Sequence, residues 1–480
     1  MNFVTTNFVL FFIPILFLGW ALRPYSLIYK LFLIAAGLFF YGQLGLQFPL
    51  LLLLVATLNW GTVRLLARCS SNERCCRWLV TADVTLHILL LAFYKYAEFI
   101  FLQLCDILNA DSPPLQWMQE SGIGDVVLPA GLSFYSFMGL SLVIDYYRDR
   151  SQPVRSFVDV LAYISFFPTI MAGPIMRGRQ FFPQLQNAEG TASGFNEGIC
   201  YILSGLFKKV VLASYLSASL VDPLFEMPDS YSATAALVGI YAYTIQILCD
   251  FSGYSDMAVG IGRLMGFQLP QNFESPYRSL NLQEFWRRWH ITLSLWLRDY
   301  LYIPMGGSRK GNRYVNLTTT MVIGGLWHGS GLNFLIWGFF HGIGLALVHG
   351  FHSIQGKLSL FTKLSGKAWS LTGKVLAWLL TFHCVAALWV FFRATDFDSA
   401  CAVFRCIFCG NGEMGFEPRI LLIIALVLVL QWAGPPCFRK FAAQMSRLPW
   451  ALQAVVAGLL GGGILAMGPE GVLPFIYFDF

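Results

Sequence analysis

Long apolar stretches recur along the whole chain, separated by shorter polar segments. Runs of about 17–25 largely apolar residues recur among them, the length that an α-helix needs to cross a bilayer. The apolar positions are continuous instead of alternating, which disfavours a transmembrane β-barrel. The pattern predicts about twelve membrane-spanning helices, near residues 7–22, 28–45, 47–66, 79–104, 126–147, 197–220, 233–250, 315–328, 333–350, 373–392, 420–434 and 451–468.

The segment 157–176 is also apolar, but it is interrupted. Phe167-Pro168 and Gly173-Pro174 fall inside it, and proline both removes a backbone donor and disfavours a helical residue before it. The pattern therefore indicates a broken or re-entrant helix. Because irregular backbone at membrane depth is tolerated only against protein or a water-filled cavity, we expect this segment to line such an interior.

The stretch 250–314 is less apolar and is rich in aromatic residues, arginine and glycine. Residues 285–300 have the spacing of an amphipathic helix. Its apolar side carries Trp286, Trp289, Leu293, Trp296 and Tyr300, and a neighbouring polar side carries Arg287, His290, Ser294 and Arg298. A charged residue at the centre of a spanning helix costs about 2.5–3.5 kcal/mol. We therefore expect this helix to lie at the cytoplasmic interface and not to cross the bilayer.

The composition supports a membrane protein, since apolar residues make up 56% of the 480 and charged residues only 12%, against about 25% in soluble chains. The first run, residues 1–20, lacks a basic region and a small-residue cleavage site, so we expect a retained span. The net charge is +6, and most basic clusters lie between predicted spans, as the positive-inside rule expects of cytoplasmic loops. Only for the region 287–313 do we favour binding of an anionic donor.

The 11 cysteines show no spacing typical of a metal site. We expect them to be small buried apolar residues, and we expect no bound metal.

Two histidines in tryptophan-rich runs are the clearest indication of chemistry. His290 ends Glu284-Phe-Trp-Arg-Arg-Trp-His290, and His328 lies in Gly324-Gly-Leu-Trp-His-Gly329. An ionisable residue at membrane depth is usually functional, and histidine suits proton transfer near neutral pH. We expect one shared buried site, with a neutral His328 as general base and His290 orienting the substrate, hydrogen-bonding a carbonyl or assisting the base. For His328 the alternative is a core histidine hydrogen-bonded to a neighbouring helix, and for His290 it is an interfacial histidine on a surface helix.

The other five histidines are expected to be structural. His341 follows His328 by thirteen residues, which is roughly 220° around one straight helix, so the two would not face one site.

The segment Asp250-Phe-Ser-Gly-Tyr-Ser-Asp256 places two carboxylates at the expected end of a span. They could bind an arginine or a substrate hydroxyl. A helix stop with a cap is the alternative, because Asp, Ser and Gly are frequent at helix ends. A serine hydrolase is disfavoured because the G-x-S-x-G motif is absent from the sequence.

Several ordered motifs extend over most of residues 1–395. They are Phe93-Tyr-Lys-Tyr96, Leu128-Pro-Ala-Gly-Leu-Ser-Phe-Tyr135, Phe167-Pro-Thr-Ile-Met-Ala-Gly-Pro174, Asp250-Phe-Ser-Gly-Tyr-Ser-Asp-Met257, Asn272-Phe-Glu-Ser-Pro-Tyr277, Glu284-Phe-Trp-Arg-Arg-Trp-His-Ile-Thr-Leu-Ser294, Trp296-Leu-Arg-Asp-Tyr-Leu-Tyr-Ile303, Gly306-Gly307 and Gly324-Gly-Leu-Trp-His-Gly329. These motifs resemble those of the membrane-bound O-acyltransferase (MBOAT) family, and within it the alginate-acetylating bacterial polysaccharide branch.

The resemblance implies an all-α polytopic membrane protein with an MBOAT-like multi-helix fold, in which re-entrant helices enclose a transmembrane tunnel. It implies one integral-membrane domain over residues 1–480, with the motif-bearing core at about 90–395 and C-terminal helices at 396–480. His328 matches the catalytic base, and His290 matches a second histidine position of the family. We expect further residues to bind substrate or line the tunnel, namely Trp286, Arg287, Trp289, Arg298, Asp299, Tyr300, Trp327, Asp250, Ser252, Tyr254 and Asp256.

The chemistry that the resemblance implies is acyl transfer from acetyl-CoA or another acetyl thioester, without a bound cofactor. The acetyl group would cross a bacterial inner membrane to O-acetylate an exported polysaccharide of the alginate or cellulose type. The implied partners are a periplasmic SGNH-type acetyltransferase, the polysaccharide synthase and export machinery, and membrane lipids, but no nucleic acid. One alternative is D-alanyl transfer to teichoic acid from a carrier-protein thioester. A non-catalytic transporter or scaffold of an export complex is another, which the paired histidines and the lack of an internal repeat disfavour.

Overall fold

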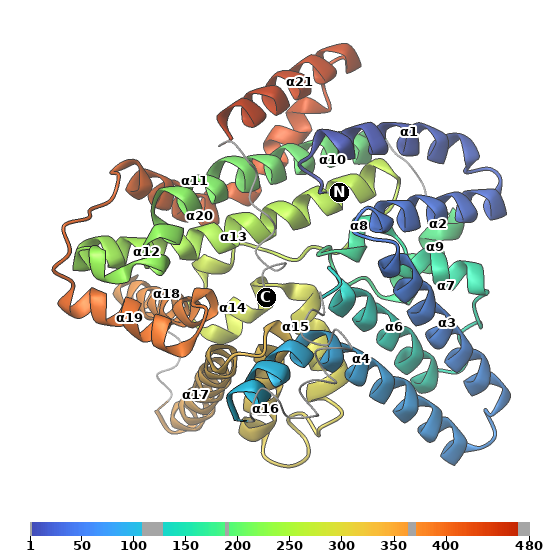
Figure 1. Ribbon diagram of the computed structural model, residues 1–480, viewed down its shortest axis with the longest axis horizontal. Coiled ribbons are helices and arrows are strands. Elements are labelled where there is room, and N and C mark those ends of the chain that lie inside the picture. The colour runs from blue at the N-terminus through green and yellow to red at the C-terminus, as the bar shows by residue number, and fades with distance from the viewer. Residues whose placement is uncertain (1, 108–127, 188–191, 363–370, 469–480) are drawn as a thin grey trace. The chain divides into compact units, whose positions relative to one another are not determined.

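The computed structural model describes residues 2–107, 128–187, 192–362 and 371–468. These residues are mainly helical, and their β-structure is limited to two isolated bridges, Tyr231 with Met414 and Ser232 with Asn411. The α-helices (Figure 1) are α1 (Thr6–Leu22), α2 (Ser26–Gly42), α3 (Gln47–Arg68), α4 (Glu73–Ile107), α6 (Leu132–Arg148), α7 (Phe157–Ile164), α8 (Phe167–Ile170), α9 (Gly178–Asn187), α10 (Ala192–Leu206), α11 (Ser214–Leu216), α12 (Asp222–Glu226), α13 (Ala233–Leu264), α14 (Leu282–Arg288), α15 (Ile291–Leu297), α16 (Arg313–His328), α17 (Leu332–Thr362), α18 (Leu371–Arg393), α19 (Phe397–Cys409), α20 (Arg419–Met445) and α21 (Trp450–Met467).

Shorter helical segments connect some of these elements. The π-helical ones are η2 (Phe207–Ala213), η3 (Ser217–Val221) and η6 (Arg298–Tyr302), and the 3₁₀ ones are η4 (Pro228–Ser230) and η5 (Pro276–Arg278).

Eight helices are long and apolar enough to cross a membrane, counted over the described residues. They cover Gln47–Arg68, Glu73–Ala97, Gly194–Glu226, Ala233–Leu264, Leu332–Ser353, Leu371–Arg393, Arg419–Met445 and Trp450–Met467. α1 and α2 are apolar too, but each has only 17 residues. The chain is therefore a multi-pass membrane protein, as predicted.

The predicted spans near 126–147 and 315–328 correspond to α6 and α16, which have 17 and 16 residues. Residues 126 and 127 lie outside the described part of the chain. Neither helix is among the eight, because a span needs about 20 residues.

One compact unit consists of residues 1–198 and 258–270. In it α3, α4 and α6 pack against one another, and α2 packs against α7 and α8. The segment 157–176 is broken as predicted, since α7 ends at Ile164 and α8 is a single turn. Every residue of α8 is buried, which is the environment that irregular backbone in a membrane requires.

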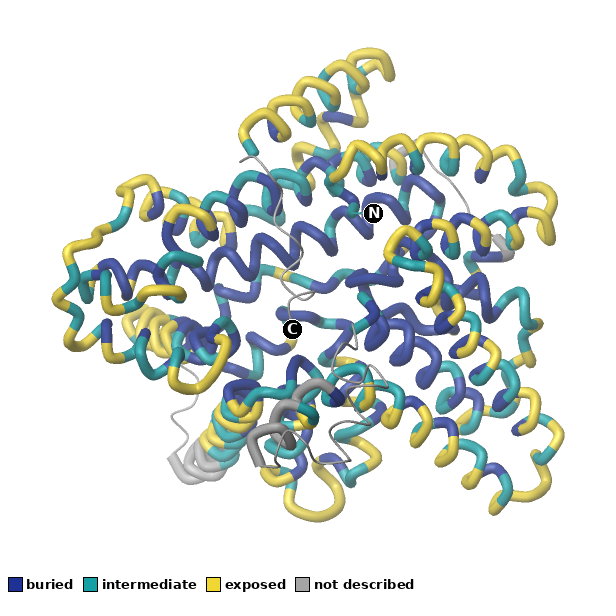
Figure 2. The backbone as a smooth tube through the Cα atoms, in the orientation of Figure 1, coloured by how far each residue is buried: buried dark blue, intermediate teal, exposed yellow. Residues whose placement is uncertain are grey.

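The second unit consists of residues 199–257 and 271–480. Its α16 and α17 form an antiparallel pair that approaches closely at glycines. A Cβ added to Gly338 would lie 2.4 Å from the carbonyl oxygen of Met321, and one added to Gly342 would lie 2.6 Å from the Cα of Thr318. α13, which runs from this unit into the first, is buried for 83% of its apolar window and is dark along its length in Figure 2.

Two predictions about elements are wrong. α13 does not end near residue 250 but continues through Asp250–Asp256 to Leu264, because both carboxylates have lysine partners at membrane depth. The predicted helix over 285–300 is divided into α14, α15 and the beginning of η6, because the backbone at His290 is left-handed. The assignment of residues 1–480 to one domain stays a prediction.

Candidate active site

His328 is the last residue of α16, and the chain turns through residues 329–331 before α17 begins. The turn is tight, since a Cβ added to Gly329 would lie 2.3 Å from the ring of Phe334. Asn333 fixes the next helix by donating its side-chain amide to the carbonyls of Phe391 at 3.0 Å and Ala394 at 2.7 Å. The beginning of α17 is thereby held at the end of α18, beside His328.

His290 lies at the break between α14 and α15. Its φ angle is 41°, and Trp289 before it is extended with ψ of 129°. A left-handed backbone costs a non-glycine residue roughly 1–2 kcal/mol, so the surrounding structure must hold it. The predicted continuous helix fails here because the spacing of apolar residues carries no signal for a single left-handed residue.

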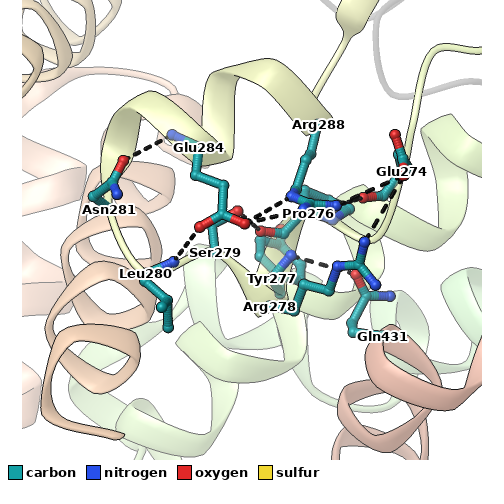
Figure 3. Close-up of polar contacts among 10 residues, drawn as sticks. All are labelled: Glu274, Pro276, Tyr277, Arg278, Ser279, Leu280, Asn281, Glu284, Arg288 and Gln431. Atoms are coloured by element: carbon teal, nitrogen blue, oxygen red, sulfur yellow. Dashed lines mark hydrogen bonds and ion pairs between the residues drawn. The ribbon is translucent and has the colours of Figure 1, made fainter. Parts of the chain in front are cut away.

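A polar network holds α14 just before this break (Figure 3). The side chain of Asn281 caps the helix by accepting from the Glu284 amide at 2.8 Å. The Glu284 carboxylate accepts from the Leu280 amide at 3.0 Å and from Arg288 Nε at 3.1 Å. Arg288 also donates to the carbonyl of Glu274 at 3.1 Å. These bonds fix both ends of a helix that has only 7 residues.

The extended segment 272–274 pairs with the residues on either side of His290. The Ile291 amide donates to the carbonyl of Asn272 at 2.9 Å, and the Glu274 amide donates to the carbonyl of Arg288 at 3.0 Å. The Thr292 hydroxyl donates to Asn272 Oδ1 at 2.6 Å. The Asn272-Phe-Glu and Glu284–Ser294 motifs therefore form one substructure that positions His290.

The ring of Trp327 contacts both histidines. Its centroid lies 6.3 Å from that of His290 and 4.7 Å from that of His328. Phe251 of α13 packs edge-on against His290 at 4.7 Å, and Phe392 of α18 packs edge-on against His328 at 4.9 Å. Both imidazoles are nearly inaccessible, at 1% and 5% exposure. Both imidazoles therefore lie near one indole ring, and their role as one catalytic site stays a prediction.

His341 also belongs to this aromatic cluster. The ring of Trp337 lies 5.2 Å from that of His328 and 4.8 Å from that of His341, and Trp286 Nε1 donates to His341 Nδ1 at 3.3 Å. The prediction that His341 faces away from His328 is wrong, because it assumed one straight helix through both residues. The helix ends at His328, and α17 returns beside α16.

The environment of His290 determines its protonation state. Burial lowers the pKa of the His290 imidazole from its ordinary value of 6.5 to about 3, because the charged form loses its hydration. The ring is therefore neutral near pH 7, with one N–H donor and one acceptor nitrogen.

The remaining predicted site residues divide into two groups. Trp286, Trp289 and Tyr300 are buried, and Trp289 packs against Trp389 at 4.8 Å. Arg287 and Arg298 are exposed, and Arg298 pairs with the adjacent Asp299 at 2.7 Å. The arginines therefore lie at the surface of this segment. Trp286 and Trp289 belong to the aromatic cluster, whereas Tyr300 packs against Trp296 at 5.0 Å.

The predicted residues of α13 are engaged inside the helix bundle. Asp250 pairs with Lys209, and Asp256 pairs with Lys208 at 2.6 Å. Ser252 and Tyr254 are buried at 4% and 1% exposure. The acids therefore connect α13 to η2, and the expectation that they bind an arginine or a substrate hydroxyl stays a prediction.

Some residues of the site were not predicted. His341 and Trp337 were not assigned to the site because the turn between His328 and Leu332 was not predicted. The aromatic run Trp337-Gly-Phe-Phe-His341 could have indicated them. Lys208 and Lys209 were visible as adjacent charges inside an apolar run. Asn272 and Glu284 stood in motifs, but their positioning role required the structure. Within the described residues no three His, Cys, Asp or Glu side chains gather as metal ligands would.

Fold and site together define a polytopic helical membrane protein with a buried histidine centre. The profile of the membrane-bound O-acyltransferase family matches residues 133–391, and the chain belongs to this family. It is accordingly an O-acyltransferase, as the resemblance implied.

Named relatives cover most of the chain. The probable alginate O-acetylase AlgI of Pseudomonas putida is 34% identical over 100% of both chains. The protein of the same name from Pseudomonas aeruginosa is 36% identical, over 99% of this chain and 88% of the relative. The peptidoglycan O-acetyltransferase of Helicobacter pylori is 34% identical, over 85% of this chain and 80% of the relative.

Proposed function

We propose that this chain O-acetylates an exported bacterial polysaccharide and that His328 is the general base. The observation that carries the proposal is the contact of both buried imidazoles with Trp327. The relatives named as O-acetylases support the acetyl group and the class of acceptor.

In this scheme, neutral His328 removes a proton from the acceptor hydroxyl while the oxygen attacks the carbonyl carbon of an acetyl thioester. The tetrahedral intermediate collapses by breaking its C–S bond, and the imidazolium returns the proton to the leaving thiolate. Since the acceptor is acylated directly, the enzyme needs no covalent intermediate and no metal.

His290 has the properties of an oxyanion donor in this step. A neutral imidazole offers one N–H, and a preorganised donor in a site closed to water is worth roughly 2.7–4 kcal/mol of transition-state stabilisation. Two further donors of the cluster, Trp337 Nε1 and His341 Nε2, have no hydrogen-bond partner among the described residues. Buried donors are normally paired, so this cluster has capacity for a polar substrate group.

In the proposed reaction, the donor and the acceptor are on opposite sides of the membrane. An acetyl thioester, such as acetyl-CoA, would enter from the cytoplasm of a bacterium, and the acceptor would be outside the inner membrane. A relay through a periplasmic acetyltransferase requires the same first step, with a hydroxyl of that partner as acceptor. The predicted tunnel, with Arg287, Arg298 and Asp299 near its cytoplasmic mouth, provides the route.

The test is O-acetylation in cells that express the chain with its native polysaccharide machinery. His328→Ala should lower the acetyl content of the polymer by about 10²–10⁴-fold, the usual effect of losing a general base. His383→Gln is the matched control. His383 is exposed, and its Nε2 lies 2.8 Å from the hydroxyl of Tyr241, so it is not part of the aromatic cluster around His328. Normal acetylation by His328→Ala, with equal amounts of membrane-inserted protein, would reject the assignment.

A further inference from the structure

An open apolar groove of about 860 Å³ runs between α16 and α17. Its walls are Tyr314, Val315, Thr318, Thr319, Phe339, Ile343, Ala346, Leu347, Gly350 and Phe351. Several of these side chains are more than half exposed, with Val315 at 57%, Leu347 at 69% and Phe351 at 55%. A Cβ added to Gly350 would meet nothing within 4 Å. The groove is therefore an accessible apolar surface of a membrane helix pair.

Basic side chains gather at one end of this groove. The guanidinium of Arg313 lies over the ring of Tyr314, 5.5 Å from its centroid, and Tyr314 forms the wall at that end. His349 and His352 flank the lining residues 350 and 351. Arg287 of α14, Arg313 and His352 all lie close enough for their charges to act on His349. Four basic groups from three helices thus meet where the groove begins.

The acids of the described residues do not neutralise this group. Neither Arg287 nor Arg313 forms an ion pair with any described residue, and the nearby Glu284 is paired with Arg288. The side chain that approaches His349 is neutral, since Gln283 Nε2 lies 3.3 Å from His349 Nε2. Two arginine charges held near one another without an acid are destabilising, so an anionic ligand would be favoured here.

The length of the groove along α17 limits which ligands can occupy it. Phe339 and Phe351 are twelve positions apart on α17, which is roughly 18 Å at about 1.5 Å per residue. The hydrocarbon core of a bilayer is about 30 Å thick, so the groove extends through little more than one leaflet. A spanning helix of a partner would need the full thickness, whereas the acyl chain of a lipid needs one leaflet only.

We propose that the groove binds one anionic phospholipid, with an acyl chain along α17 and the phosphate on Arg313 and its basic neighbours. The loop before α16 carries Arg309 and Lys310 as well, and clustered basic residues mark the cytoplasmic side. Anionic lipids are concentrated in that leaflet, and basic pockets between membrane helices bind their headgroups. The inference does not depend on acyl transfer.

The experiment is photo-crosslinking of the full chain in nanodiscs with a phosphatidylglycerol that carries a diazirine in its acyl chain. Saturable crosslinks to the Phe339–Phe351 part of α17 are expected. Unlabelled phosphatidylglycerol should compete at least about fivefold better than phosphatidylcholine, because it carries a net negative charge whereas phosphatidylcholine is zwitterionic. Gly350→Phe should abolish the crosslinks by filling the groove. Because Gly350 is in a helix with open space at its Cβ, this variant should still fold.

The charge is tested separately with Arg313→Gln, which should remove most of the preference for phosphatidylglycerol. Arg447→Gln removes the same charge from an exposed position between α20 and α21, which is not part of the groove or its basic group, and should leave the preference unchanged. Three outcomes would overturn the proposal. They are equal competition by phosphatidylcholine, crosslinks that persist in Gly350→Phe, and competition by inorganic phosphate or acetyl-CoA as strong as that by the lipid, which would assign the basic group to a soluble anion.

Discussion

At the scale of single residues, burial divides the possible roles of the two histidines. With a pKa lowered to about 3, His290 stays neutral at every pH at which the enzyme is expected to work. In the unfolded chain the same residue takes up a proton near pH 6.5. Between about pH 6.5 and 3 the unfolded state therefore binds more protons, and the stability that His290 contributes falls as the pH falls. Proton transfer by His290 near neutral pH is therefore disfavoured, and the proposed base is His328.

The first prediction follows from this neutrality. His290→Asn should retain more activity than His290→Ala, because an amide still donates a hydrogen bond, and removal of an oxyanion donor costs about 10²–10³-fold. The acid limb of kcat/KM against pH should keep its midpoint in His290→Asn, since His290 does not titrate in that range. A shifted midpoint, or Asn and Ala variants that are equally inactive, would make His290 a proton carrier.

The sequence predicted both histidines because each lies in a short motif with tryptophan. It could not predict that Trp327 would contact both, since ring contacts depend on where α16 ends. His341 was misplaced for the same reason. A helix that stops at His328 and reverses through Gly329–Gly331 brings residue 341 back toward residue 328, whereas helical periodicity assumes that the helix continues.

At the scale of elements, glycines set how closely α16 and α17 approach. Gly338→Ala should lower the melting temperature and the activity together, because its Cβ would lie 2.4 Å from the Met321 carbonyl oxygen. Overpacking of this kind costs about 1–3 kcal/mol. Gly458→Ala in α21 is the control, since a Cβ there meets nothing within 4 Å, and it should be neutral or slightly stabilising. Equal effects of the two variants would contradict the close contact.

The ion pair between Lys209 and Asp250 gives a second element-scale prediction. Its side chains are 1% and 9% exposed, and it joins η2 to the middle of α13. Lys209→Met should destabilise the protein by about 3–5 kcal/mol, because a buried carboxylate loses its partner. The double variant Lys209→Met, Asp250→Leu should recover much of this loss. If the double variant regains stability but not activity, Asp250 acts on the substrate. If it regains neither, the ion pair is not what holds η2 against α13.

Long apolar helices were predictable because a bilayer imposes their length and composition. The break in 157–176 was predictable because Pro168 and Pro174 are incompatible with a continuous helix. The break at His290 was not predictable, because no proline or glycine stands there. The backbone on either side of it is held by residues 272 and 274, which lie eighteen and sixteen positions before His290; for example, the Asn272 carbonyl accepts from the Ile291 amide. Such partners become visible only once the chain has folded. The continuation of α13 past Asp250 also depended on lysines from another segment.

At the scale of the whole molecule, the direction of the chain through the membrane follows from charge. The loop between α3 and α4 is flanked by Arg68 and Arg74, and the loop before α16 carries Arg309 and Lys310. The positive-inside rule predicts both on the cytoplasmic side. The short loop between α2 and α3 is at the other end of a span of 22 residues, so it should be outside. The reaction proposed for His328 needs this orientation, because the proposed donor is a thioester that enters from the cytoplasm.

Single cysteines placed in a background without native cysteines test this orientation. Ser71→Cys and Ser308→Cys should react with a membrane-impermeant maleimide only in inverted vesicles, and Gln43→Cys only in intact spheroplasts. All three positions are exposed in the structure, so a failure to react reports the side of the membrane and not burial. Labelling of Ser308→Cys from outside would place the basic end of the α16–α17 groove in the outer leaflet. It would also contradict the proposed entry of the donor from the cytoplasm, even if His328 proved essential for activity.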